Sequence, residues 1–123
     1  MAKYMIHAVP KRMWYVKEFL IPSMIDQGIN KRDIVVYTDK KKEGNLKSFI
    51  KSFAQAGTWE NEGTWHLQDD VIISRNFKAV TESLDFGIVC GFKSKYDGDA
   101  PSGAVPIQKI WFSFPCIRIP TQL

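Results

Sequence analysis

The fold is indicated most clearly by the stretch Thr64-Trp65-His66-Leu67-Gln68-Asp69-Asp70. Its first four residues are typical of a short buried strand, and three polar residues follow directly. Two earlier stretches have the same form. Tyr4–Val9 is apolar and closed by Pro10, and Ile34-Val35-Val36-Tyr37 is β-branched and ends at Thr38-Asp39. The sequence therefore predicts three short buried strands, each followed by polar residues.

Helical patterns separate these strands. Met13–Gln27 carries apolar residues at mostly helical spacing, and Pro22 within it predicts a kink or a split near Leu20. Gly44–Ala56 has an apolar face that includes Phe49 and Phe53, and Gly57 is expected to end this second helix.

A third helix is expected from Arg75 to about Leu84, with Ser74 as its N-cap, and Phe86–Phe92 is a strongly β-type stretch. Alternating strands and helices favour a parallel sheet with right-handed crossovers. The predicted fold class is thus a three-layer, Rossmann-like α/β fold, in which a mostly parallel sheet has helices on both faces.

The chain of 123 residues is predicted to form a single domain, residues 1–123. Residues 93–106 contain several glycines and prolines and are interpreted as a loop, and residues 107–123 as an extended tail. The sequence leaves three interpretations of this tail open. Residues 107–119 form an edge strand, a contact in a homo-oligomer, or the start of further structure.

Composition excludes several classes of protein. The chain is 45% hydrophobic and 24% charged with a net charge of +4, which is too apolar for a disordered protein. We expect no membrane span, because no apolar run approaches about 20 residues. Only two cysteines are present, which suits a reducing, cytoplasmic compartment. No Walker, Rossmann or Gly-x-Ser-x-Gly motif occurs, so the common routes to ATP, NAD and serine hydrolysis are excluded.

The residues that follow the strands form the candidate site, because parallel α/β sheets bind ligands beyond the carboxyl ends of their strands. Adjacent residues on an extended chain point to opposite sides, so two neighbouring carboxylates are expected to have separate tasks. One accepts hydrogen bonds from a ribose, and the other coordinates a hard cation such as Mg²⁺ or Mn²⁺ together with phosphate oxygens. The candidate residues are Pro10, Arg12, Asp39, Gln68, Asp69 and Asp70.

Leu67-Gln68-Asp69-Asp70-Val71, with Phe77 beyond it, resembles the DxD region of GT-A-fold glycosyltransferases. The resemblance covers roughly residues 4–92 and implies a truncated GT-A-like domain that binds a nucleotide-sugar donor. Carried over by position, it implies that Pro10, Arg12, Asp39 and Gln68 line the nucleotide. It also implies that Asp69 contacts the ribose and that Asp70 binds Mn²⁺ or Mg²⁺.

The sequence departs from the family in two respects. Gln68 stands where such families often carry an acid, which gives a QDD variant with one ligand fewer. The chain is also shorter than the family's catalytic domains, so the acceptor and its base stay unassigned. A truncated product, an excised domain and a minimal phage-encoded relative all fit this length. The expected setting is the cytoplasm of a bacterial or phage-infected cell.

Three alternatives stay open. The chain is a glycosyl-transferring enzyme or a non-catalytic nucleotide-sugar-binding or interaction protein, and a nucleic-acid-binding domain that uses Lys40–Lys42 is weighed below both. The acidic pair can instead form a solvated turn, and Asp39 can simply shape one. His7 and His66, each in a strand, are interpreted as packed or hydrogen-bonded residues rather than ligands.

Overall fold

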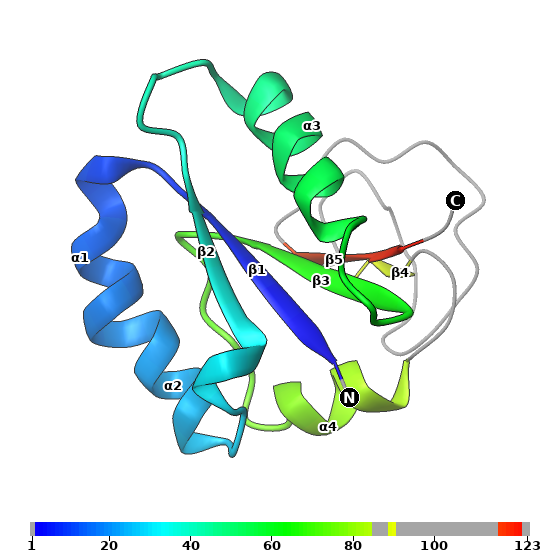
Figure 1. Cartoon of the computed structure of the whole chain (residues 1–123). Helices are drawn as coiled ribbons and strands as arrows, with labels where there is room; N and C mark the ends of the chain where they lie inside the picture. Colours follow the sequence, from blue (N-terminus) through cyan, green and yellow to red (C-terminus); the bar gives the residue numbers. More distant parts are fainter. Residues whose placement is uncertain (1, 85–88, 91–115, 122–123) are drawn as a thin grey trace, which may run out of the picture.

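The computed structural model describes residues 2–84, 89–90 and 116–121. Its sheet has five strands in the order β2-β1-β3-β5-β4 (Figure 1). Their bounds are β1 Lys3–Ala8, β2 Ile34–Thr38, β3 Gly63–Gln68, β4 Val89–Cys90 and β5 Cys116–Pro120. Central β1 is parallel to β2 and to β3, whereas β5 is antiparallel to both of its neighbours. The prediction of an open, mostly parallel α/β sheet is confirmed.

The last strand, β5, is not an edge strand, which was one of the three interpretations of the tail. β5 pairs with β3 on one side and with β4 on the other, so Cys116–Pro120 lies within the sheet. The loop predicted over residues 93–106, and the part of the tail from 107 to 115, lie outside the described residues.

The first helical segment is continuous but irregular. A 3₁₀ turn at Pro10–Arg12 leads into α1, Met13–Tyr15, and a π-helical turn at Val16–Leu20 leads into α2, Ile21–Asp26. The amide of Ile21 bonds the carbonyl of Val16, five residues earlier. Because Pro22 has no N–H to donate, the ladder is disturbed near Leu20, as the sequence predicted, and the wide turn takes up the disturbance.

The other two helices follow the predicted order. α3 spans Asn45–Ala56 and ends before Gly57, as expected. α4 spans Phe77–Ser83 and begins later than predicted, with Asn76 at its N-cap. Ser74 is not a helix cap, because residues 75–76 form a turn and the Ser74 hydroxyl bonds the Asn76 side chain at 3.0 Å.

Helices cover both faces of the sheet, which gives three layers (Figure 1). The main apolar core lies between the sheet and α1, α2 and α4; it includes Tyr4, Ile6, Leu20, Met24, Trp65 and Phe77. Tyr4 and Trp65 hold α4 on this face by hydrogen bonds to Thr81. On the opposite face, Phe49 and Phe53 of α3 pack over the strands. No helix in the described part of the chain is long and apolar enough to cross a membrane.

Candidate functional site

The carboxyl ends of β1, β2 and β3 lie at one edge of the sheet, on the left of Figure 1. From β1 the chain passes to β2 on one side of it, and from β3 it passes toward the strands on the other side. Connections that diverge from neighbouring parallel strands create a crevice where open α/β sheets bind ligands. The topology therefore places the switch point between the ends of β1 and β3.

Asp69 joins the two loops at this switch point. It directly follows β3 and is 2% exposed. Its Oδ2 accepts a hydrogen bond from the amide of Val9 at 2.9 Å, and its Oδ1 lies 2.9 Å from Nε of Arg12. A buried carboxylate is stable only when donors or cations meet it, and both of these come from the loop after β1. Asp69 thus ties the end of β3 to the β1 loop through both carboxylate oxygens, and its predicted contact with a ribose stays a prediction.

Arg12 and Pro10 stand on the outer side of this connection. Pro10 begins the 3₁₀ turn, where its missing N–H is not needed, and it is exposed. The Arg12 side chain is 45% exposed although its Nε binds Asp69. Its two terminal nitrogens have no hydrogen bond within the described residues, and a guanidinium fork of this kind suits phosphate oxygens.

Asp39 builds the loop that follows β2. Its amide donates to the carbonyl of Ala8 at 3.0 Å, which holds the loop against the end of β1. Its carboxylate accepts the amides of Glu43 and Gly44 at 2.9 and 3.0 Å. Gly44 has a φ of 90°, a conformation that favours glycine. These bonds fit the turn-shaping alternative, and a contact between Asp39 and a nucleotide stays a prediction.

Asp70 and Gln68 flank the buried acid. Gln68 ends β3 in register with His7 and is half-buried, whereas Asp70 lies in the following turn and is exposed. Among the described residues, no three His, Cys, Asp or Glu side chains gather into a group that could hold a metal ion. Asp70 offers a single carboxylate, which suits Mg²⁺ or Mn²⁺ only when phosphate oxygens and water complete the shell.

A buried polar network lies beneath α3, and the sequence did not reveal it. Nε2 of His7 lies 2.8 Å from Nδ1 of His66, and the Ser52 hydroxyl lies 3.3 Å from Nδ1 of His7. Ser52 donates to the carbonyl of Phe49 at 2.9 Å, so it accepts from His7. His7 then accepts from His66 through Nε2. This assignment of protons, inferred from the hydrogen bonds, leaves His66 Nε2 unprotonated, and that buried atom has no hydrogen-bond partner among the described residues.

Both imidazoles are held neutral by this environment. Burial lowers the pKa of His7 to about 3, and the neighbouring His66 adds to the shift. Burial likewise lowers the pKa of His66 to about 4. The ring centroids of Phe49 and Phe53 lie 4.5 Å from those of His7 and His66 respectively, and both histidines are buried. The interpretation of both as packed or hydrogen-bonded residues is confirmed, and each is the other's hydrogen-bond partner.

Comparison with protein-family models, with curated proteins and with solved structures finds no match to this chain. The features that point to a function are therefore the residues at the carboxyl edge of the sheet.

Proposed function

We propose that the chain is a GT-A-like domain that binds a nucleotide-sugar at the crevice between β1 and β3 and transfers its glycosyl group. The observation that carries this proposal is the pair of bonds from Asp69 to Val9 and Arg12. These bonds hold the loops after β1 and β3 together at the topological switch point, where nucleotides bind in open α/β sheets. A preformed site avoids the free energy of ordering loops on binding.

The two carboxylates have separate roles in this proposal. Asp69 is buried and fixes Arg12, whose terminal nitrogens are directed to the diphosphate. Asp70 is exposed and supplies the one protein carboxylate for Mn²⁺ or Mg²⁺, and the donor's phosphates supply further oxygens. When bound, the cation would offset the negative charge of the departing nucleoside diphosphate. Asp39 holds the neighbouring loop in place for the base or sugar.

Calorimetric titration with a panel of nucleotide-sugars, with and without Mn²⁺, tests this proposal. We expect Mn²⁺-dependent binding that Asp70→Ala abolishes. Asp26→Ala is the matched control, because Asp26 is also an exposed aspartate but lies at the end of α2. Failure of every donor to bind, or binding unchanged by Asp70→Ala, would remove the proposal.

Enzymatic transfer and binding alone are separated by a second assay. Incubation of a donor that binds with Mn²⁺ should release free sugar slowly, because water can replace an absent acceptor. Release that requires Asp70 supports a transferase. Tight binding without release supports the alternative, a non-catalytic nucleotide-sugar-binding protein.

A further inference from the structure

A cleft of about 850 Å³ opens at the opposite edge of the sheet, where β1, β2 and β3 begin. Its side chains include Lys3, Arg32, Val35, Trp59, Glu60 and Glu62. The strands are five or six residues long, so the two edges lie about 17–20 Å apart. This cleft is therefore separate from the carboxyl edge of the sheet, where Asp69 and Asp70 lie.

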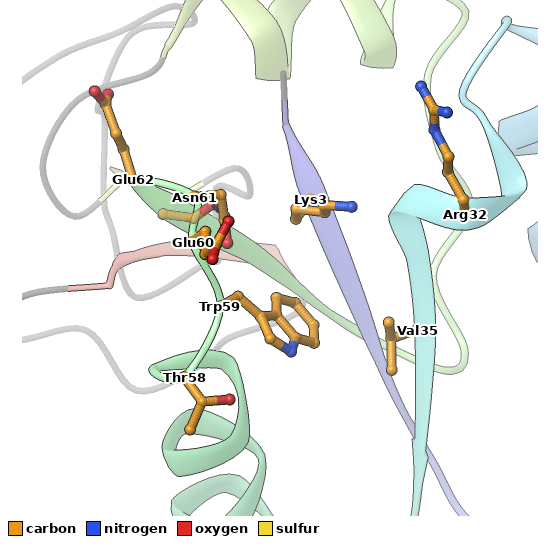
Figure 2. Close-up of a pocket in the computed structure, with 9 residues that line it drawn as sticks. Lys3, Arg32, Val35, Thr58, Trp59, Glu60, Asn61 and Glu62 are labelled. Carbon is orange, nitrogen blue, oxygen red and sulfur yellow. Dashed lines mark hydrogen bonds between the residues drawn. The ribbon is translucent and has the colours of Figure 1, made fainter.

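Charges of opposite sign line opposite walls of the cleft (Figure 2). Glu60 and Glu62 come from the segment between α3 and β3, and Arg32 comes from the turn before β2. Between the walls, the indole of Trp59 reaches toward the strands, and Val35 of β2 faces it from the far side (Figure 2). The cleft is acidic at one end, basic at the other and apolar in the middle.

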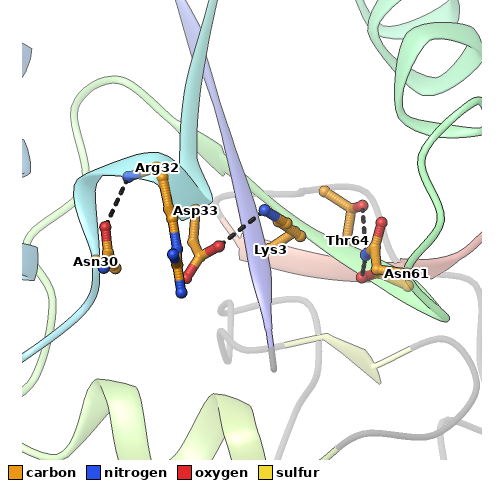
Figure 3. A network of polar contacts seen from close by, with 7 residues as sticks. Lys3, Asn30, Arg32, Asp33, Asn61 and Thr64 are labelled. Carbon is orange, nitrogen blue, oxygen red and sulfur yellow. Dashed lines mark hydrogen bonds and ion pairs between the residues drawn. The ribbon is translucent and has the colours of Figure 1, made fainter.

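Hydrogen bonds fix both walls (Figure 3). The Lys3 ammonium, between the two walls, lies 2.8 Å from Oδ1 of Asp33, which is 5% exposed. The positive charge of Lys3 is therefore already paired. On the acidic side, the Asn61 amide donates to the carbonyl of Gly63 and to the hydroxyl of Thr64. The cleft is thus preformed rather than shaped by free loops.

Several groups that line the cleft lack partners among the residues described. The side chains of Arg32, Glu60 and Glu62 are exposed and form no ion pair with any described residue. The charges at both ends of the cleft are therefore open to a ligand.

The spacing of the walls sets the length of the ligand. β2 and β3 lie on either side of β1, so the backbones of the two walls are about 10 Å apart. An extended peptide spans about 3.3 Å per residue, so about three residues cover this distance. We propose that the cleft binds a short zwitterionic peptide of about three residues, with its ammonium group at the Glu60–Glu62 wall and its carboxylate at Arg32.

Each part of such a peptide meets a complementary group. The terminal ammonium donates to the carboxylates of Glu60 and Glu62, and the terminal carboxylate accepts from the guanidinium fork of Arg32. A central aromatic or aliphatic side chain packs on Trp59 and Val35. A purely anionic ligand is repelled at the acidic wall, and a purely cationic one at the basic wall.

NMR titration of the full chain with the unblocked tripeptide alanyl-phenylalanyl-alanine tests this proposal. We expect shifts at the Trp59 indole N–H and at amides of residues 58–63, and about fivefold weaker binding for each terminus that is blocked by acetylation or amidation. In the Arg32→Gln variant, the peptide with a free carboxylate should no longer bind more tightly than the amidated peptide. In the Glu60→Gln, Glu62→Gln double variant, the peptide with a free ammonium should no longer bind more tightly than the acetylated peptide. Lys31→Gln is the matched control, because Lys31 is an exposed neighbour that does not line the cleft.

Two outcomes would overturn the proposal. One is an absence of shifts at about 10 mM peptide, where even a weak complex with millimolar affinity is populated. The other is equal affinity for the blocked and unblocked forms, which would mean that the termini are not recognised. All of these substitutions are at exposed positions, so the variants are expected to fold. Asp70→Ala should leave the titration unchanged, which separates this proposal from the nucleotide-sugar proposal.

Discussion

The histidine pair beneath α3 should make the fold sensitive to mild acid. His7 and His66 are the two histidines of the chain, and burial lowers both of their pKa values from about 6.5, to about 3 and about 4. In the unfolded chain they regain ordinary pKa values and bind protons below about pH 6.5. The unfolded state therefore binds more protons than the folded state, and stability is complete above this pH and falls as the pH drops.

The size of the effect follows from the proton balance. Each histidine that stays neutral in the fold lowers the free energy of unfolding by about 1.4 kcal/mol for every pH unit below its unfolded pKa. Between about pH 7.5 and pH 5, each histidine therefore contributes a loss of about 2 kcal/mol, and the pair a loss of about 4 kcal/mol. Because domains are commonly stable by only about 5–15 kcal/mol, this is a large share of the total.

Urea unfolding followed by circular dichroism, repeated across this pH range, measures the loss directly. His66→Asn is the informative variant, because the asparagine amide can still bond His7 from near the position of Nδ1 but does not titrate. The variant should lose only about 2 kcal/mol over the same range, whatever its stability at neutral pH. If the variant kept the pH slope of the parent chain, or if the parent chain had no slope, the two histidines would not be the source of the acid sensitivity.

Two further predictions concern stability alone. Asp69→Asn should lower the free energy of unfolding by about 1–3 kcal/mol, since a buried charged acceptor is lost, whereas Asp70→Asn should change it by less than about 0.5 kcal/mol; urea unfolding compares the two variants. Gly63→Ala would place a Cβ 2.5 Å from the guanidinium of Arg118, a residue that is 2% exposed, so this buried side chain would have to shift. We expect a loss of about 1–3 kcal/mol and a lower melting temperature, in contrast to Gly57→Ala, where the nearest atom is 3.4 Å away.

Local patterns predicted the elements well where hydrophobic periodicity was strong. β1, β2, β3 and α3 lie where short apolar runs and an apolar helix face indicated them. The predicted start of α4 was wrong, because Ser74 and Asn76 are both residue types that cap helices and the sequence alone does not choose between them; in the structure, Asn76 precedes the helix and makes no side-chain capping bond. The order of strands in the sheet, with β5 between β3 and β4, depends on pairing between distant segments that no local pattern encodes.

The candidate site was predictable in its location but not in its contacts. Parallel strands have their carboxyl ends at one edge of the sheet, so the segments after β1, β2 and β3 were expected to lie there. In the structure they do. The bond between His7 and His66 joins residues 59 positions apart, so it was not read from either strand alone. The sequence feature that could have indicated this bond is the alternation of side chains between the two faces of each strand. Once the register of β1 and β3 is known, this alternation places both imidazoles on one face of the sheet. The cleft at Trp59 has no motif, since its walls come from three separate segments.

The adjacent residues Asp69 and Asp70 allow effects on folding stability to be distinguished from effects on ligand binding. One is buried and bonded to Val9 and Arg12, and the other is exposed in the following turn. A carboxylate that holds two loops together is already engaged, so its loss should act on stability first and on ligand binding through the position of Arg12. A carboxylate in solvent contributes little to folding, so its loss should act on cation-dependent binding alone. Measured together, Asp69→Asn should move the unfolding midpoint and Asp70→Asn should move only the Mn²⁺ dependence of nucleotide-sugar affinity. If both substitutions weakened binding equally at unchanged stability, the two acids would share one ligand, and the division of labour proposed for them would be wrong.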